Sequence, residues 1–459
     1  MDLDPVFLSR VQFAFVIAFH ILLPAFTVGL ASFIVLLEGL HVVKRDAIYL
    51  RLSVFWTRIF AVSFGMGVVS GIVMPFQFGT NWSRFSEVGG NIFAPLLAYE
   101  GMVAFFLESG FLGILLFGRK LVPPWAHFFA ALMVALGTLF SSFWILSFNS
   151  WMQTPQGHEL IDGRFLPASW LAIIFNPSFP YRLMHTVTGF YLTTAFAVLG
   201  VTAWLMKHGR HIAESQRVMA MTVTFIAIFV PLQITFGDLH GLNTLAHQPV
   251  KVAAMEGHWE TRARAPAVLF AIPDERTERN LAEIAIPGFA SVYLTHSLDG
   301  VVPGLKSVPA SDRPPVMPVF FAFRIMVGIG LLMLAIALWG LWLRWRGRLF
   351  TSRAYQNACI AMLPAGFIAV IAGWTVTEVG RQPWIVQGLL RTRDAVTPSL
   401  TGGDVLVSLA LYVIVYAVVF GAGLYYMLQL ARAGPPDRVD LRDAKLGERP
   451  ARPLSGADS

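Results

Sequence analysis

Residues 358–384, ACIAMLPAGFIAVIAGWTVTEVGRQPW, combine a long apolar run with an acid and an arginine at its end. The run predicts a helix that crosses a lipid bilayer and ends shortly after Glu378. An acid at the edge of the hydrocarbon is unfavourable, so it usually has a partner or a function. Trp374 precedes Glu378 by one helical turn, so a flat ligand would meet both side chains. The alternative is an interfacial acid paired with Arg381.

The composition indicates a membrane protein with several spans. Of the 459 residues, 56% are hydrophobic and only 13% are charged, and several apolar runs are longer than a soluble core helix needs. The net charge of +7 does not indicate a nucleic-acid partner, because the arginines lie between the apolar runs. The start of the chain lacks a basic signal-peptide region, so we expect the first run to be retained as a helix. The single cysteine, Cys359, excludes disulfides within the chain, thiolate zinc sites and covalent CxxCH haem attachment.

We therefore predict an all-α integral membrane protein with nine transmembrane helices. They are expected near residues 11–37, 54–78, 94–118, 126–150, 184–206, 217–236, 317–343, 355–379 and 404–430. An odd number of spans places the two termini on opposite faces. The loops after the first, third, fifth and seventh helices carry more Lys and Arg than the short loops on the opposite side, so the N-terminus is predicted to be periplasmic and the C-terminus cytoplasmic.

One connection differs from the other, shorter loops. We divide the chain into helices 1–6 (residues 1–236), a polar periplasmic loop (237–316), helices 7–9 (317–431) and a cytoplasmic tail (432–459). Long loops in compact proteins are usually functional or disordered, and the scattered aromatic residues favour an ordered cover with short helices. The charged, Pro-rich tail is expected to be disordered.

Four potential metal ligands fall in the outer half of the membrane when depth is measured from these boundaries. They are His20, His185, Met326 and Glu378. Imidazole and thioether groups suit haem iron, and a His/Met pair is a known low-spin ligand set. Each residue alone has an ordinary explanation as a hydrogen-bonded or core side chain. Arg324, two residues from Met326, favours the haem, because a buried arginine needs an anion such as a propionate.

The third helix carries two acids, Glu100 and Glu108, which face the same broad side. Carboxylates arranged along a membrane helix are typical of a proton relay. Hydroxyl and amide side chains of the fourth helix, such as Ser141 and Asn149, are candidates for the same path. The alternative for each acid is a protonated carboxyl bonded to a neighbouring helix.

Seven segments in this order form a pattern that is specific as a whole. They are SRVQF (9–13) followed by His20, FQFGTNW (76–82), Glu100 with FFLES (105–109), MHTV (184–187), KVAAME (251–256), FRIM (323–326) and GRQPW (380–384). With them, the chain resembles subunit I of cytochrome bd-type quinol oxidases, from Leu8 to about Leu430.

The resemblance implies a terminal oxidase subunit with three haems in a bacterial inner membrane. His185 and Met326 would hold a low-spin haem b, while His20 and Glu378 would hold two high-spin haems, one haem b and one either haem d or a further haem b. Arg10, Arg324, Arg381 and Trp374 are expected to contact the haems.

The same resemblance assigns the substrates and partners. Lys251 and Glu256 would oxidise ubiquinol or menaquinol under the loop, called the Q-loop in this family. Glu108 and Glu100 would bring cytoplasmic protons to dioxygen, which generates proton motive force without pumping. A second, similarly folded subunit is expected as partner, with a small single-helix subunit as an optional accessory.

Two features separate this sequence from the enterobacterial pattern. In the enterobacterial pattern an acid precedes the segment that corresponds to Phe76, whereas this chain has Pro75 at that position. The Q-loop of this chain is also a short form, without the long insertion of some family members. The segment MPFQF (74–78) is similar to the cyanide-insensitive branch of the family. A proton-coupled transporter using Glu100 and Glu108 is a rival, but it would predict repeats and broken helices. A cytochrome that only relays electrons from quinone is another, and it would need two axial ligands on every haem. A haem–copper oxidase is disfavoured, since the chain has no adjacent His pair to hold copper.

Overall fold

The computed structural model describes residues 3–439, which contain nine helical segments long and apolar enough to cross a membrane. They are Pro5–Lys44 (α1), Ala47–Thr80 (α2), Ser83–Lys120 (α3 Ser83–Tyr99, η1 Glu100–Phe105, α4 Phe106–Phe117 and η2 Gly118–Lys120), Pro124–Gln153 (α5), Phe179–Lys207 (α7), Ile212–His247 (α8), Val316–Trp345 (α11), Arg353–Val379 (α12 Arg353–Ala361 and α13 Ala365–Val379) and Gly402–Ala433 (α14). The predicted fold class and all nine predicted spans are confirmed.

The helices extend beyond the predicted apolar segments because a helix does not stop where the hydrocarbon ends. The largest difference is in α8, which ends at His247 instead of near residue 236. The connection between the sixth and seventh spans is therefore shorter than predicted. It covers residues 248–315, and we refer to this segment as the Q-loop.

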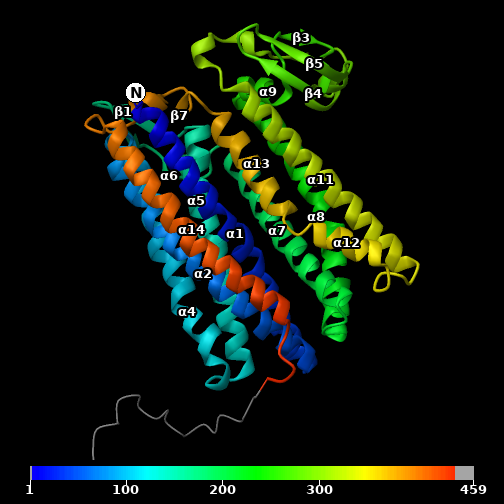
Figure 1. Cartoon of the computed structure of the whole chain (residues 1–459). Coiled ribbons are helices and arrows are strands. Elements are labelled where there is room, and N and C mark those ends of the chain that lie inside the picture. Colours follow the sequence, from blue (N-terminus) through cyan, green and yellow to red (C-terminus); the bar gives the residue numbers. More distant parts are fainter. Residues whose placement is uncertain (1–2, 440–459) are drawn as a thin grey trace, which may run out of the picture.

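Two groups of helices pack side by side (Figure 1). In one group, α1 packs against α2 and α5, and Leu30, Ile34 and Trp56 lie in its core. In the other group, α7 packs against α8 and α12, with Phe196 and Tyr355 fully buried. Contacts of α1, α5 and α13 with α7 join the groups, while α14 lies against α1 and α2.

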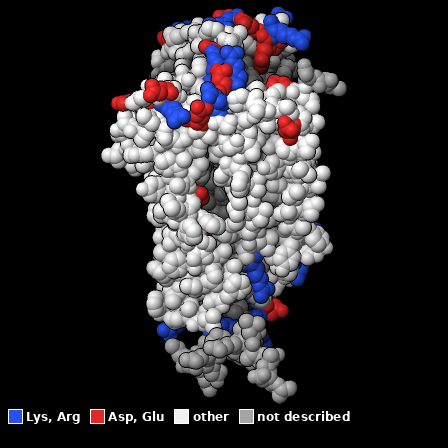
Figure 2. Space-filling model, turned by 90° about the vertical axis from the view of Figure 1, so that its left-hand side faces the viewer, with Lys and Arg blue, Asp and Glu red and all other residues white. Residues whose placement is uncertain are grey.

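The chain starts and ends at opposite ends of this bundle. The N-terminal end of α1 lies at the same end as the Q-loop, and α14 finishes at the other end (Figure 1). This agrees with an odd number of spans. Figure 2 shows charged side chains gathered at both ends and a nearly uncharged band between them, with an acidic side chain visible in a hollow of the band.

The Q-loop is ordered, but it is not only helical. Its elements are α9 (Pro249–Glu256), β3 (Arg262–Ala263), β4 (Ala267–Asp274), β5 (Arg279–Ile286), α10 (Phe289–Thr295), β6 (Val301–Val302), η3 (Leu305–Ser307) and η4 (Ala310–Asp312). The antiparallel β4–β5 hairpin was not predicted. Its turn is closed by Asp274, whose carboxylate accepts hydrogen bonds from the Arg276 amide and the Thr277 hydroxyl. Val252 and Ala253 of α9 and Val319 of α11 lie in one buried cluster, which fixes the loop on the bundle.

Smaller elements close the same end of the molecule. They are β1 (His158–Ile161), β2 (Arg164–Pro167), α6 (Trp170–Ile174), β7 (Trp384–Val386), β8 (Leu390–Arg391) and η5 (Thr392–Asp394). Asp162 and Gly163 between β1 and β2 have φ of 49° and 74°, which fits a type I′ hairpin turn. The predicted tail begins inside α14, which continues to Ala433. The expected disorder falls mainly on residues 440–459, which lie outside the described residues.

A buried ionic cluster holds the opposite end together. Glu38 of α1 accepts a hydrogen bond from Arg119 at 2.5 Å and another from Ser53 of α2. His127 Nδ1 of α5 lies 3.2 Å from the second Glu38 oxygen, and His127 Nε2 lies 3.1 Å from the Leu115 carbonyl. The cluster therefore connects four segments of the first helix group.

We predict that Arg119→Ala destabilises the protein, because it leaves the buried Glu38 carboxylate without its guanidinium partner. The expected loss is about 3–5 kcal/mol, seen as a lower Tm of the purified complex. Lys120→Ala, at the exposed neighbouring position, is the matched control and should change the Tm little. Equal Tm values for the two variants would contradict a stabilising role of the cluster.

Candidate functional site

Glu378 lies in a buried polar cluster at the Q-loop end. Its Oε1 accepts hydrogen bonds from Asn149 Nδ2 at 2.9 Å and from Gln153 Nε2 at 3.4 Å, both from α5. Its Oε2 pairs with the Arg381 guanidinium, whose side chain is only 6% exposed. The pairing with Arg381 agrees with the interfacial alternative. Arg381 is buried, whereas the Glu378 side chain is 22% exposed, so the ion pair lies at the edge of the protein interior.

Arg182 adds a second buried guanidinium to this cluster. It lies in the first turn of α7, and its Nη1 donates to Asn149 Oδ1 at 3.4 Å. Asn149 thus contacts both Glu378 and Arg182. The sequence analysis did not single out Arg182. A charged residue three positions before His185, within the first turn of a span, was the signal that could have found it.

Lys251 of α9 points into the same region. Its Nζ donates to Gln153 Oε1 at 2.6 Å and to Gln248 Oε1 at 2.9 Å. Burial, and then the charges of Arg182 and Arg381, lower the pKa of Lys251 well below its usual value. A surface Lys/Glu pair is excluded for this residue, because Lys251 is buried and its amine donates to two glutamines.

The cluster has more cationic groups than acids. Arg182, Arg381 and Lys251 face the single carboxylate of Glu378, and burial also lowers the pKa of Arg381. Among residues 3–439, nothing accepts a hydrogen bond from Arg182 Nε or from Nε and Nη1 of Arg381. Buried donors without acceptors are unfavourable, so the region fits an additional anion such as the carboxylate of a bound group.

The His and Met ligands predicted from the sequence share one packing feature. Each lies against a glycine of a neighbouring helix, and a Cβ on that glycine would fall within 3.1 Å of the ligand side chain in the pairs His20–Gly71, His185–Gly237 and Met326–Gly373. Any larger residue at these glycines would displace the ligand. The close approach therefore fixes where the three donor groups lie.

Hydrogen bonds on Nδ1 orient both histidines. His20 Nδ1 lies 2.9 Å from Ser70 Oγ, and His185 Nδ1 lies 3.2 Å from the amide of Gln233. The buried Gln233 Oε1 has no partner among the described residues, so rotating this amide by half a turn would let it accept from Nδ1–H. Nδ1 is thus engaged in both rings, which leaves Nε2 as the nitrogen that could bind a metal.

Glu256 is buried on another side of α9 and contacts different residues from Lys251. Arg324 Nη2 lies 3.3 Å from Glu256 Oε2, and Arg324 also donates to the carbonyls of Met255 and Val268. Burial, and then the nearby Glu256 carboxylate, raise the pKa of Tyr293. The anion that Arg324 contacts is thus supplied by the Q-loop, which removes the need for a propionate inferred from the sequence.

The two predicted relay acids face α5. Glu100 accepts a hydrogen bond of 2.7 Å from Ser141, while Glu108 packs against Gly137, one turn away on the same face of α5. Between them the helix has a π turn, Glu100–Phe105, which was not predicted. A π turn rotates less per residue than an α-helix and so keeps the two acids aligned. Such turns are frequent at functional sites.

The remaining predicted haem contacts lie at the same end. Arg10 lines an opening of about 270 Å³ together with Gln382 and Arg391. Trp374 packs beside Ile21 and Ala25 of α1, and its buried Nε1 has no partner within residues 3–439. The structure thus brings Trp374 and Glu378 of α13 next to the helix that carries His20.

Comparisons with known proteins agree with this arrangement. Residues 8–435 match the family model described as cytochrome bd terminal oxidase subunit I. The chain belongs to this family. It is 37% identical over 433 residues to the cytochrome bd ubiquinol oxidase subunit 1 of Bacillus subtilis, with 92% of each chain covered. It is 34% identical to the cytochrome bd-II ubiquinol oxidase subunit 1 of Escherichia coli, with 94% of this chain and 97% of that protein covered.

A solved structure gives the same result for the fold. The bd oxidase of Geobacillus thermodenitrificans matches with a TM-score of 0.87 at 30% identity, covering 95% of this chain and 100% of that chain. The family predicted from the seven motifs is confirmed, and with it the oxidoreductase class. The comparisons do not support the transporter as an alternative.

The lowered pKa of Lys251 predicts how stability changes with pH. The folded protein releases the Lys251 proton at a lower pH than the unfolded chain, so stability rises with pH between the folded pKa and about pH 10. Lys251→Met removes this titration. Tm measured on the purified complex from pH 7 to pH 10 should therefore rise more in the wild type than in the variant.

A matched control is available in the same loop. Lys306 is more exposed and pairs with Glu260 at 2.6 Å, so Lys306→Met should keep the pH dependence of the wild type. Parallel Tm curves for the wild type and Lys251→Met would show that Lys251 keeps an ordinary pKa in the folded protein.

Proposed function

We propose that this chain is the haem-carrying subunit of a quinol oxidase, which oxidises quinol under the Q-loop and reduces dioxygen to water. The observation that carries this proposal is the buried cluster around Glu378. It combines a candidate axial ligand with an excess of buried cations, directly beneath α9. The two relatives from Bacillus subtilis and Escherichia coli are named as ubiquinol oxidase subunits, which supports quinol as the electron donor.

Four side chains would hold three haems. His185 and Met326 would be the two axial ligands of a low-spin haem b. His20 and Glu378 would each hold one high-spin haem, one a haem b and the other a haem d or a further haem b. When bound, these groups would carry electrons from quinol and reduce dioxygen, and single axial ligands on the last two would leave an iron position open.

The cationic side chains would orient the haems. Arg182 and Arg381 have buried donor atoms without acceptors among residues 3–439, and haem propionates are anions of suitable geometry. Arg10 and Trp374 lie at the same end and would complete these contacts. Arg324 is engaged with Glu256, so we propose that it acts by positioning this acid beside the low-spin haem.

Quinol oxidation requires groups that accept protons at the Q-loop end. Glu256 is buried and is held by Arg324 near Tyr293, where it would hydrogen-bond a quinol hydroxyl and take up its proton. The Lys251 amine points into the neighbouring cluster, where it would hydrogen-bond the other quinol oxygen. The different partners of Lys251 and Glu256 fit two separate contacts on one quinol.

Protons for water would come from the opposite face of the membrane. Glu108 lies deeper along the helix than Glu100, and both face α5, so a proton would pass from Glu108 to Glu100 and Ser141. If the Q-loop is periplasmic, as the distribution of basic residues predicts, quinol protons leave outside while water protons enter from the cytoplasm. Proton motive force would then arise without a pump.

The enzyme would act in the bacterial inner membrane with a second subunit. Only 11% of the most apolar window of α14 is buried, so lipid or a partner helix must cover this span. Subunit II of the oxidase is the partner that the family implies, with a single-helix accessory subunit as a further component. The electron donor would be ubiquinol or menaquinol.

The proposed ligation predicts a spectral change in one variant. His185→Ala should remove the low-spin absorbance from the reduced-minus-oxidised spectrum of the purified complex, because Met326 alone does not keep the iron six-coordinate. His208→Ala, an exposed histidine at the end of α7, is the control and should leave the spectrum unchanged. An unaltered low-spin band in His185→Ala would refute the assignment. A far-red chlorin band in the wild type would identify haem d.

The proton route predicts slower turnover without loss of haem reduction. Glu108→Ala and Glu100→Ala should each lower quinol-dependent oxygen consumption by at least tenfold, because proton delivery is removed. The low-spin haem should still be reduced by quinol. Ser109→Ala, next to Glu108 but with its hydroxyl bonded to the Phe106 carbonyl of its own helix, is the control. Normal oxygen consumption in both glutamate variants would exclude the route.

A further inference from the structure

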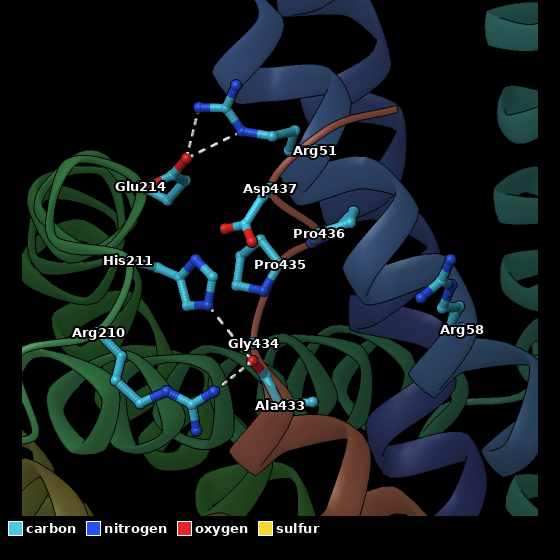
Figure 3. Close-up of a pocket in the computed structure, with 10 residues that line it drawn as sticks. All are labelled: Arg51, Arg58, Arg210, His211, Glu214, Ala433, Gly434, Pro435, Pro436 and Asp437. Carbon is cyan, nitrogen blue, oxygen red and sulfur yellow. Dashed lines mark hydrogen bonds and ion pairs between the residues drawn. The ribbon is translucent and has the colours of Figure 1, made fainter. Parts of the chain in front are cut away.

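A basic pocket lies at the end opposite the Q-loop, away from the proposed haem and quinol sites. It has a volume of about 720 Å³ and opens between α2, the α7–α8 connection and the residues that follow α14. Figure 3 shows its walls. Arg51 and Arg58 come from α2, Arg210 and His211 precede α8, and residues 434–437 pass between these two sides.

Two of the arginines are engaged in building the pocket. Arg51 donates to Glu214 Oε1 through Nε at 2.9 Å and through Nη2 at 2.5 Å. Arg210 donates to the last carbonyls of α14, including that of Ala433 at 3.1 Å. These contacts fix α2, α8 and the end of α14 relative to one another, so the pocket has a defined shape.

Arg58 is different. It lies about three turns into α2, on the same helix face as Arg51 seven residues earlier. Its side chain is exposed, and it forms no hydrogen bond or ion pair with another residue of the described chain. A guanidinium within a membrane-spanning helix is unfavourable without an anion. The chain's own acids in the pocket do not supply it, because Glu214 pairs with Arg51 and the Asp437 carboxylate points to the Glu214 side, away from Arg58 (Figure 3).

We propose that this pocket binds a phosphate group, with Arg58 as its main ligand and His211 on the opposite wall. The planar guanidinium matches the geometry of phosphate oxygens. Two sources present this chemistry: the headgroup of an anionic phospholipid and a soluble phosphate compound. Basic pockets between membrane helices on the cytoplasmic side are typical headgroup sites, and the poorly buried α14 leads from this pocket into the apolar band, where acyl chains would lie.

The test measures binding to the purified oxidase complex and needs no turnover, so it is independent of the proposed quinol oxidase activity. Delipidated complex is titrated with phosphatidylglycerol or with zwitterionic phosphatidylcholine, and bound lipid is counted by native mass spectrometry. In a second arm, inorganic phosphate and pyrophosphate are added, and the Tm is measured. The variants are Arg58→Gln, Arg58→Lys and Asp437→Asn. The control is Arg346→Gln, an exposed arginine beside Trp342 and Trp345 on the same membrane side.

We expect Arg58→Gln to bind the phosphate-bearing ligand about fivefold more weakly, Arg58→Lys to lose less, and Asp437→Asn to bind more tightly because a competing negative charge is removed. If Arg58→Gln weakens only the binding of phosphatidylglycerol, the ligand is the lipid headgroup. If Arg58→Gln abolishes the increase in Tm with phosphate or pyrophosphate, the ligand is a soluble phosphate compound. Unchanged binding in Arg58→Gln and Asp437→Asn in both arms would overturn the proposal, as would an equal loss in Arg346→Gln. Asp437→Asn, at a residue beyond α14, keeps the test valid if Arg58→Gln does not fold.

Discussion

Buried positive charge at the Q-loop end is the constraint on which the proposed site depends. Arg182, Arg381 and Lys251 surround the carboxylate of Glu378, and several of their donor groups have no acceptor within residues 3–439. A protein interior does not normally retain such donors without a reason, because each one lost its water on folding. Bound anions at this place would satisfy the arginines. Burial, and then the charges of Arg182 and Arg381, lower the pKa of Lys251. The cluster is built from α9, which carries Lys251, and from the end of α13, which carries Glu378. Gln153 and Asn149 of α5 supply polar contacts to it.

The fold separates this cluster from the opposite end by an apolar band. The length of the membrane-spanning helices sets the distance between the two ends of the molecule. Close contacts with glycines determine where the His and Met side chains lie along these helices. The acids Glu100 and Glu108 are the exceptions inside the band, and both are aligned on α5 by a π turn. Carboxylates at that depth are tolerated where protons must pass. At the far end, the Glu38 cluster fixes the helices, while the Arg58 guanidinium has no partner among residues 3–439.

Much of this could be predicted from the sequence because membrane helices leave a strong signal. Apolar length alone located all nine spans, and seven short motifs identified the family. The site was predicted only in part. His20, His185, Met326 and Glu378 were proposed because polar groups stand out in apolar runs, whereas Arg182 at the start of a helix was not predicted. The partner of Arg324 could not be predicted, because Glu256 is close to it only in space.

Other features also depended on information that the linear sequence does not contain. The π turn at Glu100 could not be predicted, because its residues look like those of an ordinary helix. The β4–β5 hairpin was not predicted, because the scattered aromatic residues of the Q-loop were taken to favour short helices. Asp274, which closes the hairpin turn, was a signal in the sequence for this hairpin. The helix ends were placed too early, because hydropathy marks the hydrocarbon boundary and not the last helical hydrogen bond. Hydropathy and charge predicted the spans and the candidate residues, whereas the π turn, the hairpin and the exact helix ends could not be predicted from them.

The central claim is that the Q-loop end of this single chain holds three haems on His20, Glu378 and the His185/Met326 pair. Pyridine haemochromogen analysis of the purified complex, with subunit I quantified by amino-acid analysis, tests it most directly. The account predicts three haems per copy of this chain. One haem or none would contradict it.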